Sequence, residues 1–158
     1  MTKTLTLLLL LIAALYAQHD HAGVDSRGDK VMGFSHEKTT HHFRLYDDGG
    51  SIEVEANSAD DTASRDQIRS HLRHIATMFT AGNFEAPMLI HAKTPPGVPA
   101  MQKLKSEISF RFRQTPRGAA VDIVTTNPDA LPAVHEFLRF QISDHRTGDP
   151  ATASRRPR

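Results

Sequence analysis

Histidine and methionine are the residues of this chain whose side chains could do chemistry. The 158 residues include ten His and five Met but no Cys. Imidazole nitrogens suit copper, zinc and iron, and thioether sulfur is a soft ligand that favours copper(I). The lack of Cys excludes disulfides, thiol nucleophiles, cysteine-based zinc sites and iron–sulfur clusters. The soft metal ligands that this chain can offer are therefore imidazole and thioether groups.

The candidate metal ligands fall in two short segments of the chain. They are Met32, His36, His41, His42, His71 and His74. His71 and His74 lie three residues apart on an expected helix, where two side chains can reach one ion. No fixed ligand spacing such as His-Glu-x-x-His occurs. Copper is the favoured ion, and zinc at an all-His site is the alternative.

A b-type haem is a second candidate ligand, because His or His/Met axial ligation needs no covalent attachment. The candidate cofactor-binding residues are His41, His135 and Met78. His135 stands on an otherwise apolar helical stripe, where an unpaired buried polar group costs about 1–3 kcal/mol. Its ring must therefore bind a ligand or hydrogen-bond to a backbone carbonyl. The Phe residues that could line a haem pocket are Phe43, Phe79, Phe110, Phe112, Phe137 and Phe140.

Familiar catalytic motifs are missing from the sequence. There is no Gly-x-Ser-x-Gly, Ser-x-x-Lys, P-loop or Gly-x-Gly-x-x-Gly. If the protein is an enzyme, the only chemistry that the sequence predicts is redox chemistry at a metal or haem. The sequence thus predicts an exported protein that binds a transition metal or haem through clustered His and Met. The alternative is a non-catalytic structural or protein-interaction module with structural histidines.

The elements that must position these residues follow a ββα pattern that occurs twice, over about residues 41–82 and 108–148. In each copy, alternating apolar residues predict a β-hairpin. A helix follows each hairpin, over about residues 64–81 and 129–146. His145, at the end of the second helix, is expected to interact favourably with the negative end of the helix dipole. The pattern predicts an α+β fold, in which duplicated ββα units form a four-stranded, mostly antiparallel sheet with two long helices on one face.

The two expected helices carry matching stripes at helical spacing. The stripes are Ile68, Leu72, Ile75 and Phe79 on the first helix, and Leu131, His135, Leu138 and Ile142 on the second. Phe137 and Phe140 lie off the second stripe, so the last helix is apolar on more than one side. That second surface predicts either a homodimer through the last helix or burial beneath the lead-in or the segment that links the two copies.

The N-terminus has the features of a secretory signal peptide. Lys3 precedes an apolar run over residues 5–15, and Ala17 is the expected cleavage site. The run is too short to span a bilayer of about 30 Å as a helix. A periplasmic or secreted protein is therefore expected, with no integral membrane segment after cleavage.

The remaining boundaries follow from composition. Residues 18–30 have little pattern and predict a flexible lead-in, and residues 31–149 form one α+β domain. Residues 150–158 hold three Arg and predict a disordered basic tail. The formal net charge of the whole chain is +1. No basic stripe with interleaved aromatic residues occurs, so a nucleic-acid partner is not expected.

Six segments carry a resemblance to known proteins: Met32–Phe34, Thr39–Phe43, Ala63–Asp66, His71–Ile75, Pro95–Val98 and His135–Ile142. Together they resemble a family of small exported His-rich bacterial proteins of unassigned function, over most of residues 27–149. Some members of that family bear the name aspartate carbamoyltransferase. This chain is too short for the catalytic subunit of that enzyme and lacks its Ser-Thr-Arg-Thr phosphate motif. It also lacks the four Cys of the regulatory subunit's zinc site. The resemblance therefore implies domain boundaries and no carbamoyltransferase activity.

Overall fold

The computed structural model of the chain describes residues 23–157. The expected signal peptide, residues 1–17, and the start of the expected lead-in lie outside the described residues. No helix among residues 23–157 is long and apolar enough to cross a membrane.

Four strands of eight residues form one antiparallel sheet in the order β1-β2-β4-β3. They are β1 (Thr39–Tyr46), β2 (Gly49–Ala56), β3 (Ile108–Thr115) and β4 (Gly118–Thr125). Two-residue loops close both hairpins, and β2 pairs with β4 to join them. Because side chains alternate between the faces of a strand, His41 and Phe43 share a face and His42 takes the other.

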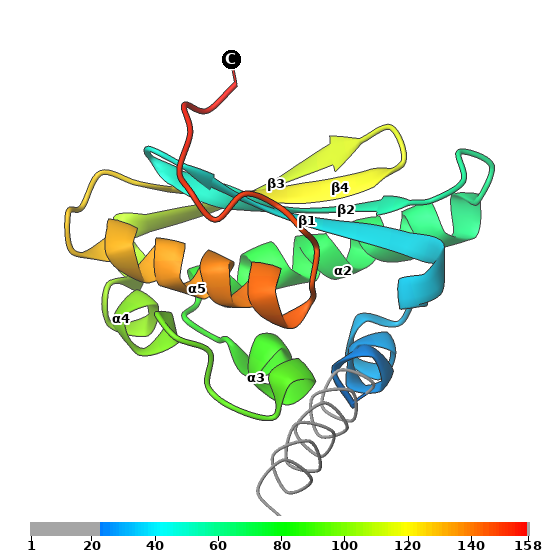
Figure 1. Cartoon of the computed structure of the whole chain (residues 1–158), viewed down its shortest axis with the longest axis horizontal. Coiled ribbons are helices and arrows are strands. Elements are labelled where there is room, and N and C mark those ends of the chain that lie inside the picture. Colours follow the sequence, from blue (N-terminus) through cyan, green and yellow to red (C-terminus); the bar gives the residue numbers. More distant parts are fainter. Residues whose placement is uncertain (1–22, 158) are drawn as a thin grey trace, which may run out of the picture.

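Two long helices, α2 (Thr62–Thr80) and α5 (Ala130–Asp144), cover the same face of the sheet (Figure 1). Helix α2 packs mainly on β3 and β4, whereas α5 packs mainly on β1 and β2. The predicted α+β fold is therefore confirmed. That the two ββα units arose by duplication remains a prediction.

Shorter helices fill the rest of the chain between β2 and β3 and before β1. They are α3 (Glu85–His91), α4 (Val98–Lys103) and the 3-10 helices η1 (His36–Lys38) and η2 (Lys105–Glu107). Asp61 caps the start of α2, because its carboxylate accepts a hydrogen bond from the Ser64 backbone N–H at 2.9 Å. The side-chain oxygen of Asn127 likewise accepts hydrogen bonds from the backbone N–H groups of Asp129 and Ala130 at the start of α5.

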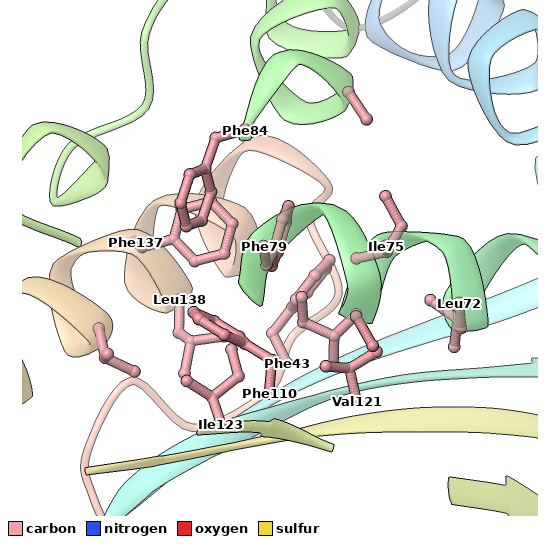
Figure 2. Close-up of a cluster of buried hydrophobic side chains, with 14 of the residues drawn as sticks. Phe43, Leu72, Ile75, Phe79, Phe84, Phe110, Val121, Ile123, Phe137 and Leu138 are labelled. Carbon is pink, nitrogen blue, oxygen red and sulfur yellow. The ribbon is translucent and has the colours of Figure 1, made fainter. Parts of the chain in front are cut away.

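Aromatic rings dominate the core between the sheet and the helices (Figure 2). Phe79 of α2 stacks on Phe84 with ring centroids 4.3 Å apart, and it meets Phe110 and Phe137 edge to face. Fully burying a side chain such as Phe contributes roughly 1.5–3 kcal/mol. These rings therefore join α2, α5, β3 and the start of α3 into one core.

The second apolar side of α5 is covered by the linker between the two hairpins. Phe137 is fully buried against Phe84. The half-buried Phe140 meets the His91 ring at 4.9 Å, and the Lys93 ammonium lies 4.8 Å from its centre. Burial under the segment between the two hairpins thus accounts for the positions of both Phe137 and Phe140. The homodimer remains a prediction.

The segment before η1 is helical over residues 23–32, so the expected flexible lead-in is wrong for residues 23–30, the part of it that the structure describes. Val24 and Gly28 are buried, and the Arg27 side chain donates a hydrogen bond to the Ile90 carbonyl at 2.7 Å. Only Val24 and Gly28 are buried in this helix, so its sequence shows little hydrophobic periodicity. Its packing places Met32 beside the sheet.

The basic tail, residues 150–158, was expected to be disordered, and that prediction is wrong for its described part. Ser154 makes a parallel β-bridge with Tyr46 beside the outer edge of β1, where the segment crosses the sheet (Figure 1). The Arg156 guanidinium binds both oxygens of Asp48 at 2.9 and 3.0 Å and stacks on the Tyr46 ring. The one Nε–H of Arg156 is shared between the two Asp48 oxygens, and this charge-assisted contact holds a segment of low apolar content against the sheet.

Candidate functional site

Three histidines from distant parts of the chain line one small cavity between the sheet and the helices. His41 comes from β1, His71 from α2, and His145 from the residue that ends α5. The cavity has a volume of about 50 Å³. Apart from Met32 and Gln141, the rest of its wall is apolar: Phe43, Ile52, Val54, Leu72, Ile75, Phe79, Ala86, Pro87, Ile90 and Phe137.

The rings of His41 and His145 lie parallel, with centroids 5.7 Å apart and planes 7° from parallel. His91 meets the other side of this pair, because its ring stands edge-on to His145 at 5.0 Å. Phe34 packs beside both His41 and His71, with centroids at 6.1 and 5.7 Å. The imidazoles therefore form a continuous aromatic group along the cavity.

The cavity histidines are held in their neutral form. Burial, followed by repulsion from His145 and His71, lowers the pKa of His41 from 6.5 to about 3. Burial and the neighbouring His74 lower the pKa of His71 to about 4. Burial and the neighbouring His91 lower the pKa of His145 to about 4, against the opposing effect of Asp144. At neutral pH each of the three rings keeps a nitrogen lone pair that can accept a proton or bind a metal.

Met32 links the cavity to a larger outer cleft of about 380 Å³. Only Met32, His41 and His145 line both spaces, so these three side chains form the boundary between them. The outer cleft is more polar, with Asp25, His36, Thr39, Thr40, Arg146 and Thr147 among its lining residues. The boundary residues thus face an apolar cavity on one side and a polar cleft on the other.

A buried polar network formed by His91, Gln141 and Asp144 lies beside His145. Asp144 accepts a hydrogen bond from His91 Nδ1 at 2.5 Å, and Gln141 Oε1 lies 2.9 Å from His91 Nε2. The His91 side chain is fully enclosed. This network ties α3 to the end of α5 and limits where the His145 ring can lie.

Local geometry explains why His145 reaches the cavity. Its backbone N–H caps α5 by donating to the Gln141 carbonyl at 2.9 Å. The next residue, Arg146, takes a left-handed conformation with φ of 51°, which turns the chain away from the helix axis. His145 is therefore fixed at a helix end directly above β1.

The structure brings together only some of the predicted site residues. Met32, His41 and His71 line the cavity, and His36 lies in the outer cleft, where its ring pairs with Asp29 at 3.0 Å. Because Asp29 and its neighbours stabilise the charged ring against partial burial, the pKa of His36 is raised.

The other predicted ligands lie elsewhere, and their assignment to this site is corrected. His42 points to the opposite face of the sheet, where its Nδ1 pairs with Asp149 at 2.9 Å. His74 is exposed on α2, and Met78 does not line the cavity. His135 Nε2 lies 2.8 Å from the Tyr46 carbonyl and 3.0 Å from that of Gly49. Its role is the backbone hydrogen bond that the sequence analysis gave as the alternative to ligand binding.

Sequence reasoning missed His145 and Gln141 as site residues. His145 was expected to interact with the helix dipole and was not among the candidate ligands, although its position on the same broad face of the helix as His135 was a signal. Gln141 lies within the buried face of α5, and a polar residue among apolar ones at that spacing was the corresponding signal.

Among residues 23–157, no group of three or more His, Asp or Glu side chains is arranged to hold a metal ion. Comparisons with protein-family models, curated proteins and solved structures found no match. What the site can do must therefore be argued from its own geometry.

Proposed function

We propose that this protein binds a single copper ion, as copper(I), through His41, His145 and Met32. The observation that carries the proposal is that these three side chains alone line both the cavity and the outer cleft. Two imidazoles and one thioether form a soft donor set, and such a set favours copper(I) over harder ions.

The electrostatics of the site support a metal that binds neutral ligands. The depressed pKa values of His41 and His145 keep both rings unprotonated at neutral pH. A metal ion then need not displace a proton from either ring. No carboxylate lines the inner cavity, so a singly charged ion suits this wall better than a divalent one.

The size and donor set separate copper from the other ligands considered. Zinc sites use four ligands, or three with an open position, drawn from Cys, His and carboxylates. The described residues hold no such group of three. Haem needs a pocket of several hundred Å³ with apolar walls, whereas the apolar cavity measures about 50 Å³. The volume thus favours an ion.

The outer cleft supplies an approach to the boundary residues. It opens beside η1 and the turn after α5, and it contains the carboxylate of Asp25 and the ring of His36. Polar groups along such a path can exchange hydration water for protein ligands as an ion enters. Export predicted by the N-terminal sequence would bring the protein to a compartment where it meets copper outside the cytosol.

Competition with the chromogenic copper(I) chelator bicinchoninate, under anaerobic conditions, tests the proposal. The full chain without its signal peptide is expected to bind one copper(I) per molecule. The variants His41→Phe and His145→Phe should each weaken binding more than about tenfold, since each removes one of three ligands. His74→Phe serves as the matched control, because His74 is exposed on α2.

X-ray absorption of the loaded protein gives an independent measure, with nitrogen and sulfur neighbours both expected at the copper. If the wild type holds copper(I) no more tightly than the double variant H41F/H145F, the proposal is wrong. The histidines would then belong to a structural or interaction module without a bound metal.

A further inference from the structure

Strand β3 is an outer strand of the sheet, and backbone groups along its free edge lack partners. Because a two-residue loop joins β3 to β4, the odd-numbered residues from Ser109 to Thr115 exchange their hydrogen bonds with β4. The even-numbered residues Phe110, Phe112 and Gln114 therefore direct their N–H and C=O groups away from the sheet. None of these groups has a hydrogen-bond partner among residues 23–157. Such a row is a template to which an extended chain can add a strand.

Two guanidinium groups without a carboxylate partner flank this edge, one on each face of the sheet. Arg111 projects on the face that the helices leave open, where its Nε donates to Ser109 Oγ at 3.1 Å. Arg73 of α2 lies on the other face, with its guanidinium carbon 4.6 Å from the centre of the Phe112 ring. Neither makes a salt bridge with another residue among 23–157. Both are exposed, so each can pair with a carboxylate that arrives from outside.

The other charges beside this edge leave it basic. Arg113 lies on the same face and pairs with Asp122 at 3.1 Å. Asp122 also pairs with Arg156, so its charge is already shared between two guanidiniums. The other carboxylate that the sequence places next to the strand is Glu107, just before its first residue. Arg113 and the two guanidiniums above therefore outnumber the carboxylates here, and an acidic strand would be attracted to this edge.

We propose that β3 binds an extended acidic segment of a partner protein as an added strand of the sheet. The segment's residue opposite Phe112 would exchange backbone hydrogen bonds with it, and that residue's two neighbours would face Arg111 and Arg113. Glu or Asp at those two positions pairs with the guanidiniums. A β-branched residue between them packs beside the half-buried Phe112 ring. No residue of β3 lines the histidine cavity, so this binding needs no metal.

A second copy of the chain fits this edge less well than an acidic segment does. If two β3 strands paired antiparallel about Phe112, Arg111 of one copy would lie opposite Arg113 of the other. Like charges directly opposite each other destabilise a strand pair. The same side chains thus disfavour self-association and favour an acidic partner.

A short, blocked, fluorescein-labelled peptide in which Glu alternates with Val tests the proposal by fluorescence anisotropy. The metal-free full chain without its signal peptide is expected to bind it, and a peptide with Lys in place of Glu is expected not to bind. The double variant R111Q/R113Q should weaken binding about fivefold or more, since it removes both facing charges. R146Q/R155Q is the matched control, because it removes the same charge at two exposed residues outside β3.

Amide hydrogen exchange of protein labelled with nitrogen-15 tests the backbone pairing separately. Bound peptide should slow exchange at Phe110, Phe112 and Gln114. Exchange at Arg111 and Arg113 should change little, because their amides already face β4. N-methyl groups on the Val nitrogens of the peptide, which would face β3, should abolish binding, whereas N-methyl groups on the Glu nitrogens should not.

Three results would overturn the proposal. They are no binding at millimolar peptide, equal binding by wild type and R111Q/R113Q, and binding that leaves exchange at Phe110, Phe112 and Gln114 unchanged. Slower exchange at these three amides that depends on protein concentration alone would identify a second copy as the occupant, and the proposal would then be wrong as well.

Discussion

His41 and His145 stack in parallel at the boundary between an inner cavity and an outer cleft, with ring centroids 5.7 Å apart. One ring belongs to the first strand and the other to the end of the last helix. The pair therefore exists only when α5 is docked on β1. Any ligand bound by both rings would stabilise that docking by the free energy of its binding to the folded state.

The stacked pair is expected to serve binding and not stability. In His41→Phe and His145→Phe, an aromatic ring of similar shape replaces a half-buried imidazole, so the free energy of unfolding without metal should change by less than about 1.5 kcal/mol. Phe43→Ala, by comparison, removes a core ring that lines the same cavity and should cost about 3–5 kcal/mol. Urea unfolding at pH 7 measures both. Large losses in the His variants, comparable with Phe43→Ala, would favour the structural-module alternative.

Acid is expected to destabilise the metal-free protein through the cavity histidines. Unfolded His has a pKa near 6.5, whereas the folded pKa values of His41, His71 and His145 are about 3, 4 and 4. Between these limits the unfolded chain binds more protons, so stability is fully present above about pH 6.5 and falls as the pH drops towards 4 and below.

Single substitutions resolve this effect. Replacing one of the three rings by Phe should lower the slope of unfolding free energy against pH, between pH 4.5 and 6, by up to about 1.4 kcal/mol per pH unit. Ile75→Val changes the same cavity wall without removing a titrating group and should keep the wild-type slope. A wild-type unfolding free energy that stays flat from pH 6.5 to 4 would contradict the prediction.

His135 is expected to matter for stability and not for copper. Its ring bonds to the carbonyls of Tyr46 and Gly49, which flank the β1–β2 turn. His135→Leu leaves both acceptors without this donor and should cost roughly 1–3 kcal/mol. The neighbouring substitution Glu136→Leu, on the exposed side of α5, is the control. Thermal unfolding and copper(I) competition together check this prediction, and a variant that keeps its stability but loses copper would disprove it.

Arg156 is expected to fasten the C-terminal segment to the sheet. Its guanidinium binds the Asp48 carboxylate and the carbonyls of Gly50 and Ile123. Arg156→Ala removes these charged hydrogen bonds and should lower the unfolding free energy by roughly 1–3 kcal/mol. Arg155→Ala, at an exposed neighbour, should have little effect. Equal urea midpoints for the two variants would show that the segment is held in another way.

The strands and helices could be predicted from the sequence because each is indicated by the spacing of apolar residues within one short segment. Alternation around Phe43 and the spacing of Ile68, Leu72, Ile75 and Phe79 predict elements that the structure contains, with all four helix residues buried. Strand order, by contrast, depends on β2 pairing with β4. That contact joins distant segments and leaves no signal in either hairpin alone.

The site was less predictable because its members are joined by tertiary contacts. His41 could be placed on the helix-facing side of its strand by alternation. His135 and His145 lie on the same helix, yet one is held by backbone carbonyls and the other lines the cavity. The difference arises from the turn at Arg146, next to His145, and from where β1 ends, which is set far away in the sequence.

Several backbone groups along the outer edge of β1 are already paired within the chain. The Phe43 N–H donates to Asp149, the Asp47 N–H donates to the Ser154 carbonyl, and the Leu45 carbonyl accepts from the Ser154 N–H. The opposite edge, β3, instead carries the side chains of Arg111 and Arg113, and charge of this kind discourages pairing with a second copy of the strand. The C-terminal segment that holds Asp149 and Ser154 thus covers part of one edge of the sheet. Proteolytic removal of the segment that holds Asp149 and Ser154 would leave these backbone groups of β1 open to pairing with a strand of another chain.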